Sequence, residues 1–239
     1  MAKKPGPGPC VHCLKIVEHR NWDHVFPRSW YPDTTPSDVE KWKVPTCRPC
    51  NDEYGRIEHE LLTTLSMCVD PKTSESSGIY GKALRSLDPS QGKTDKDRRA
   101  REEKKQQILS QILTGDEIPK EGIYPGLGER WDRPRAEQSA LFVPAKSLQR
   151  LVEKIVRGIV FIEDQRLIDE RMEIEHHVVN EAGSKEIEDA LARFGVVHSR
   201  GPGIQVARAV TPEDGVSALY KITVWGQFVM YASVMPRLA

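Results

Sequence analysis

The clearest periodic pattern of apolar residues lies in the second half of the chain. Apolar residues recur at spacings of three and four from Leu148 to Val160, which is the pattern of a helix with one buried face. A second helix is expected over "SKEIEDALARFG", ending at Gly195. Strands are expected at "ALFV", at "MEIEHHVV", near residues 203–210 and over residues 219–234. Residues 139–239 are therefore expected to form a small α+β domain.

Residues 71–138 have a different composition, because polar residues, glycine, proline and serine dominate them. The stretches "PKTSESSG" and "DPSQGKTDKD" flank one expected helix, from about Asp95 to Leu113. From Lys82 to Lys105 there are nine Lys or Arg against five Asp or Glu, which we interpret as a solvated helix face. We expect this segment to be a polar linker with one helix.

The first 70 residues predict the order strand, loop, strand, helix. A β-type run, "LKIVEHRNWDHV", is followed by a proline-rich loop and by "KWKVPT". The next piece, "NDEYGRIEHELLTTLSM", has Ile57, Leu61 and Leu65 at helical spacing. Together with residues 139–239, this pattern predicts an α+β chain with two folded parts.

The charge balance limits how the chain can meet a polyanion. Its 239 residues contain 35 Lys or Arg and 35 Asp or Glu, so there is no net field to attract nucleic acid or an anionic membrane. No window of about 18 apolar residues is present, and "MAKKPGPGPC" lacks the apolar core of a signal peptide. A soluble, cytoplasmic protein without a membrane partner is expected.

Four of the five cysteines form two C-x-x-C pairs, Cys10 with Cys13 and Cys47 with Cys50. Each pair can present two thiolates to one tetrahedral ion, so the sequence predicts a closed, structural zinc site. A redox role for either pair, or His12 or His19 in place of a cysteine, remains an alternative. Cys68 is expected to be a small, buried apolar residue.

The segment enclosed by the cysteine pairs resembles a known family. "DHVFPRSWYP" and "VPTCRPCNDEYGRIEHEL" are similar to the zinc-supported bacterial subgroup of the HNH, or ββα-metal, endonucleases, which reads (D/E)HV-x-P and then VP-x-C-x-x-CN. The similarity covers residues 10–62. It implies a ββα-metal nuclease domain in residues 1–70, followed by the linker and by a domain for partner or substrate recognition in residues 139–239.

The resemblance implies roles for individual residues. Asp23 and Asn51 would bind a catalytic Mg²⁺ or Mn²⁺ ion, and His24 would be the general base. A histidine suits that task because its ordinary pKa lies near neutral pH. The arginines close to this motif, which can grip phosphate through paired N–H donors, are Arg28, Arg48 and Arg56.

Some features depart from a simple match. The asparagine that the family has between the two strands should fall near residues 41–43, where none is present. Adjacent residues of a strand point to opposite faces, so Asp23 and His24 act together only if the strand bends or if the pair lies at the hairpin end. Glu58 follows Asn51 by two helical turns, about 10 Å of rise, and is expected with His59 on a solvated helix face.

Two functions are compatible with these patterns. The first is an HNH endonuclease that cuts or nicks DNA with a protein partner, in a bacterial anti-phage defence or restriction system. The second is a zinc-stapled module that binds nucleic acid or protein and whose catalytic site has decayed. Trp22, Trp30 and Trp42 are expected to form the hydrophobic shell of the first part rather than to stack on bases.

Overall fold

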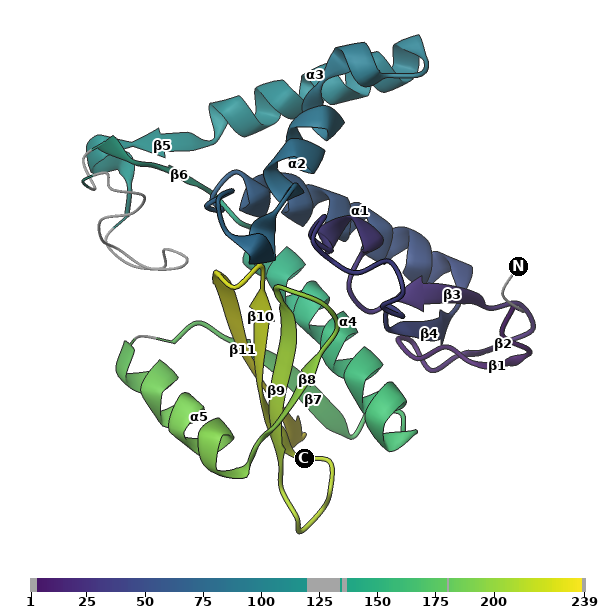
Figure 1. The fold of residues 1–239 in the computed structure, drawn as a ribbon. Coiled ribbons are helices and arrows are strands. Elements are labelled where there is room, and N and C mark those ends of the chain that lie inside the picture. Colours follow the sequence, from purple (N-terminus) through teal and green to yellow (C-terminus); the bar gives the residue numbers. More distant parts are fainter. Residues whose placement is uncertain (1–3, 120–133, 135–136, 180, 238–239) are drawn as a thin grey trace.

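The computed structural model describes residues 4–119, 134, 137–179 and 181–237 (Figure 1). Its first part contains two small antiparallel sheets and one long helix. Strand β1 (Gly8–Pro9) pairs with β2 (Ile16–Val17), and β3 (Asn21–His24) pairs with β4 (Lys43–Thr46). Helix α1 (Arg48–Ser66) begins directly after β4, with a proline in its first turn, where a missing backbone N–H costs nothing. The predicted order strand, loop, strand, helix is therefore present.

The middle part contains one helix more than the sequence predicted. The expected helix is α3 (Asp95–Ser110), whose first turn is capped by the Thr94 hydroxyl. A second helix, α2 (Ile79–Leu87), precedes it, and β5 (Ile112–Thr114) pairs with β6 (Ser139–Leu141). Most of the remaining linker, residues 120–133, lies outside the described residues.

The last part is built on a five-stranded antiparallel sheet with the order β7-β11-β10-β9-β8. Along β10 buried and half-buried residues alternate, which is the pattern of a strand with its two faces in different surroundings. The strand expected over residues 219–234 is a hairpin of two strands, and β8 was not predicted. The strands are β7 (Met172–His177), β8 (Val196–Ser199), β9 (Ile204–Val210), β10 (Ala218–Val224) and β11 (Phe228–Pro236).

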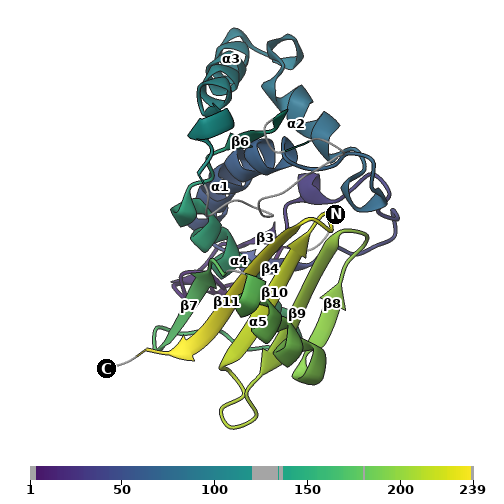
Figure 2. The same cartoon turned by 90° about the vertical axis from the view of Figure 1, so that its left-hand side faces the viewer.

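Two helices cover the two faces of this sheet. Helix α5 (Glu181–Phe194) packs on the outer face, where Glu188 binds Lys221 of β10. Helix α4 (Ala145–Asp164) lies on the inner face, between the sheet and the strand-and-helix unit of the first part (Figures 1 and 2). Its apolar stripe is the one predicted from Leu148 to Val160, and it is buried. The α+β class is thus confirmed.

A single hydrophobic cluster joins the first part to the last. Val25 and Trp30 belong to the same cluster as Leu151, Ile155 and Trp225. The boundaries at residues 70 and 138 therefore do not separate two independent cores. Trp30 and Trp42 are buried, as expected for a hydrophobic shell, whereas Trp22 is 39% exposed.

Four short 3₁₀ helices complete the described structure: Arg28–Trp30, Ser74–Ser76, Pro89–Gln91 and Gly115–Glu117. No helix among the described residues has the length and the apolar character needed to cross a membrane.

Candidate functional site

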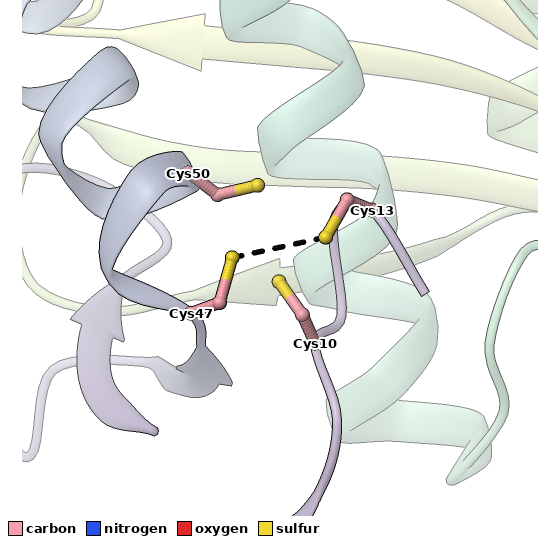
Figure 3. Close-up of side chains that lie close together, drawn as sticks. All are labelled: Cys10, Cys13, Cys47 and Cys50. Carbon is pink, nitrogen blue, oxygen red and sulfur yellow. Dashed lines mark hydrogen bonds between the residues drawn. The ribbon is translucent and has the colours of Figure 1, made fainter. Parts of the chain in front are cut away.

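The four cysteines of the two C-x-x-C pairs converge on one point (Figure 3). Cys10 and Cys13 lie in a tight turn after β1, which Leu14 closes in a left-handed conformation, with its N–H donating to the Cys10 carbonyl oxygen. Cys47 is the residue immediately before the first residue of α1, and Cys50 lies in the first turn of this helix. The start of a helix and a tight turn thus face each other across the site.

The distances between the sulfur atoms suit a zinc ion. All four Sγ atoms lie within 4.8 Å of one another, and those of Cys13 and Cys47 are 3.7 Å apart. A tetrahedral ion with Zn–S bonds of about 2.3 Å places its sulfurs about 3.8 Å apart. Burial raises the pKa of the Cys47 and Cys50 thiols, so a bound cation is needed to favour the thiolate form of these two groups. The four cysteines are therefore able to hold one zinc ion, as predicted.

On the inner side of β3, the Asp23 carboxylate contacts two other side chains. Its Oδ1 lies 3.2 Å from the Nζ of Lys154, which comes from α4. Its Oδ2 lies 3.5 Å from the Nε2 of His12, a residue that stands between Cys10 and Cys13 in the sequence. His12 is buried against the Tyr54 ring, with ring centroids 4.7 Å apart. Asp23 is thus a buried carboxylate that faces the interior between β3 and α4.

Glu58 meets the same lysine from the side of α1. Its Oε1 contacts the Lys154 Nζ, and its side chain is only 13% exposed. The expectation that Glu58 belongs to a solvated helix face is therefore wrong, because α4 packs against α1 and covers this position. The neighbouring His59 is exposed, as expected.

The two carboxyl groups differ in how readily they ionise. Burial raises the pKa of Asp23, but the neighbouring His12 and Lys154 outweigh burial, so the pKa of Asp23 lies below its usual range. Burial raises the pKa of Glu58 to about 7, against the opposing charge of Lys154. At neutral pH the site therefore holds one ionised carboxylate and a second that is partly protonated.

His24 lies at the end of the ladder between β3 and β4. It is the last residue of β3, pairs with Lys43, and is followed by a backbone hydrogen bond from Val25 N to Trp42 O at 3.0 Å. Asp23 and His24 thus have the second of the two expected arrangements, at the end of the hairpin. Asp23 is buried, whereas His24 is half-buried.

The surroundings of His24 favour a neutral imidazole. Burial, followed by the charge of Arg28, lowers the pKa of His24 below its usual value. Arg28 itself is exposed, at the start of the short helix after β3. A neutral, half-buried imidazole beside a guanidinium group can accept a proton close to a bound anion.

The loop between β3 and β4 is held at its two ends by a main-chain bond. The Val25 N–H, just after β3, donates to the carbonyl oxygen of Trp42, just before β4. Near residues 41–43, where no asparagine is present, this backbone bond therefore fixes the loop.

The remaining predicted residues lie on α1. Asn51 is half-buried in the first turn, and within the described ranges no hydrogen bond joins its side chain to Asp23 or His24. Arg48 pairs with Asp52 at 3.4 Å, and Arg56 donates to the Asp52 carbonyl oxygen. The structure thus brings Arg28 near His24, but it ties the other two arginines to their own helix.

Lys154 is the residue that the sequence reasoning missed. It lies three residues after Leu151 and one before Ile155, but at 3.6 residues per turn it falls outside the apolar stripe of α4, and its side chain is nevertheless fully buried. A lysine is almost never fully buried unless it is paired. The apolar periodicity of α4 therefore did not signal this burial, which depends on the packing of α4 against α1 and β3.

In comparisons with known proteins, no family model, no curated protein and no solved structure matched this chain.

Proposed function

We propose that this chain is a metal-dependent HNH endonuclease that hydrolyses or nicks DNA. The observation that carries the proposal is the placing of its motif residues. Asp23 and His24 end the first strand of a hairpin, and α1, which bears Asn51, starts immediately after the second strand. The cysteine cluster ties the beginning of the chain to this helix start. Such a scaffold holds a histidine on a rigid element rather than on a loop.

His24 is the general base in this proposal. Phosphodiester hydrolysis needs a group that removes a proton from the attacking water, and burial together with Arg28 keeps the imidazole neutral and able to accept it. Arg28 donates N–H groups to the phosphate beside it, since a guanidinium group matches two phosphate oxygens.

The inner face of the hairpin fits a hard divalent ion. Mg²⁺ and Mn²⁺ prefer oxygen ligands, and Asp23 supplies a buried carboxylate of which one oxygen has no hydrogen-bond partner among the described residues. The resemblance implies Asn51 as the second ligand. Glu58 is a further carboxylate, and it contacts the same Lys154 ammonium group as Asp23 does. When bound, the ion supplies positive charge for the phosphate and the leaving oxygen.

The charge of the chain suggests a dependence on partners. With no net charge, the protein has no long-range attraction for DNA, so we propose weak intrinsic affinity and recruitment by another protein. A bacterial anti-phage defence or restriction system is the proposed setting, by analogy with the family.

A zinc-stapled binding module without catalysis is the second candidate. The contact of Asp23 with Lys154 favours it, because a carboxylate held by an ammonium group is less available to a metal ion.

Cleavage of supercoiled plasmid tests the proposal. The zinc-loaded full chain is used at micromolar concentration and low salt, which offsets weak electrostatic binding. Nicked or linear product that forms only with Mg²⁺ or Mn²⁺ supports the nuclease. Salt-sensitive DNA binding without cleavage under every condition supports the binding module and contradicts the nuclease.

A further inference from the structure

The contact of Lys154 with Asp23 and Glu58 is the least ordinary feature of the described structure. The lysine side chain is 0% exposed, although an ammonium group loses strong hydration when it is buried. Its Nζ lies 3.2 Å from Asp23 Oδ1 and also contacts Glu58 Oε1. One cation thus joins three elements, β3, α1 and α4.

The two carboxylates form a small site with a common centre. They come from different elements, and two carboxylates this close repel each other unless a cation lies between them. The Lys154 ammonium group is that cation here, which shows that both oxygens can reach a single positive charge.

Ligand atoms that the ammonium group does not use lie beside this centre. Asp23 Oδ2 is buried and has no hydrogen-bond partner among the described residues. It faces the Nε2 atom of His12 at 3.5 Å, at the outer limit of a hydrogen bond, and the other ring nitrogen of His12, Nδ1, is buried without a hydrogen-bond partner among the described residues. Buried polar atoms without partners are rare in proteins and call for a ligand or another explanation. The site therefore offers more ligand atoms than a lysine needs.

We propose that Asp23 and Glu58 form a site for a hard divalent cation, and that the Lys154 ammonium group competes with this cation for it. The inference rests on the proposed function, which it deepens by naming Glu58 as a metal ligand and α4 as the element that holds the site closed.

The charges explain why the two cations exclude each other. When both carboxyl groups are ionised, their net charge with one ammonium group is about −1, and with one divalent ion it is about 0. If the ammonium group and the divalent ion were both present, two cations would be in contact in a buried place. A divalent ion therefore enters as Lys154 leaves.

Binding of Mn²⁺ to the full chain tests the competition. Titration calorimetry on zinc-saturated protein compares the wild type with Lys154→Met, which keeps the side-chain volume and removes the charge. We expect Lys154→Met to bind Mn²⁺ at least about tenfold more tightly, because it lacks the competing cation. Glu58→Gln in the same background should remove that gain.

Lys146→Met is the matched control, because Lys146 lies exposed in the first turn of the same helix. It should bind Mn²⁺ as the wild type does. Equal Mn²⁺ affinity of the wild type and Lys154→Met overturns the inference.

If Lys154→Met is too unstable for calorimetry, its melting temperature is compared with that of the wild type, with and without Mn²⁺. The ion should then raise the melting temperature of this variant more than that of the wild type, and equal shifts overturn the inference. If the variant does not fold in either condition, the same measurements on Lys154→Gln decide, with the same two outcomes.

Plasmid cleavage separates this inference from the proposed function. Tight Mn²⁺ binding by Lys154→Met without cleavage by any form of the protein contradicts the nuclease and leaves the cation site supported. Cleavage by the wild type with unchanged Mn²⁺ affinity in Lys154→Met contradicts the competition alone.

Discussion

The indole Nε1 of Trp225 donates a hydrogen bond of 2.6 Å to the backbone carbonyl oxygen of Trp30, which is 195 residues away in the sequence. Both side chains are fully buried, and their ring centroids are 5.2 Å apart. The turn between β10 and β11 is thereby fixed to the segment that follows His24. The stability of the hairpin and that of the sheet are thus coupled.

Trp225→Phe should destabilise the whole protein. The substitution leaves the Trp30 carbonyl oxygen buried without its donor and removes ring volume, which together cost about 2 kcal/mol or more. The measurement is the free energy of unfolding in urea. Trp22→Phe is the control, because Trp22 is 39% exposed, and it should change stability by about 0.5 kcal/mol or less. Equal effects of the two variants would contradict this coupling.

Gly158 allows α4 to approach the hairpin closely. A Cβ atom at this position would lie 2.6 Å from Cγ2 of Val25, the residue after His24. Gly158→Ala is therefore expected to cost about 1–3 kcal/mol through overpacking.

Gly55→Ala provides the comparison within a helix, because a Cβ atom at Gly55 meets nothing within 4 Å. Alanine is the better helix former, so this variant should be neutral or more stable by up to about 1 kcal/mol. Thermal unfolding of both variants is the measurement. A neutral Gly158→Ala would argue against the close packing of α4 on β3.

Zinc content is expected to depend on the four clustered cysteines. Cys47→Ser should lose the metal and unfold the first part of the chain, since the ion closes the site between the turn and α1. Cys68→Ser should keep one zinc ion per chain, because Cys68 packs against the hydrophobic core and lies outside the cluster. Metal analysis with circular dichroism checks both, and full zinc content in Cys47→Ser would rule out a four-cysteine site.

Acidification should destabilise the fold through His176. Burial, and then the neighbouring His177, lowers the pKa of His176, so the unfolded chain binds this proton more readily than the folded one. The free energy of unfolding therefore falls as the pH drops from about 7 through the lowered pKa. Urea unfolding at about pH 7.5 and pH 5 should show a smaller loss for His176→Leu than for the wild type. An equal loss would mean that His176 does not contribute.

Local patterns in the sequence predicted the elements whose signals are strong. The stripe from Leu148 to Val160 predicted α4, and the two C-x-x-C pairs predicted the cysteine cluster, because each signal is contained in a short segment. Helix α2 was missed although Ile79, Ala83 and Leu87 have helical spacing, since the surrounding glycine, proline and serine favoured a linker.

The contact of Glu58 with Lys154 could not be predicted in the same way. The two residues are 96 positions apart, and only the packing of α4 on α1 brings them together. Glu58 by itself has the pattern of a solvated helix position. Long-range packing decides its burial, and a single sequence without its tertiary contacts does not contain that information.

In the proposed nuclease, His24 removes a proton from the attacking water during DNA hydrolysis. The most direct test is the rate of Mn²⁺-dependent plasmid cleavage by the full chain, compared between His24→Ala and His19→Ala, since His19 is exposed ahead of β3. A general base contributes about 10²–10⁴-fold to a rate, so His24→Ala should lose that factor while His19→Ala keeps the wild-type rate. Equal cleavage by His24→Ala and the wild type, with zinc content and folding unchanged, would contradict the account.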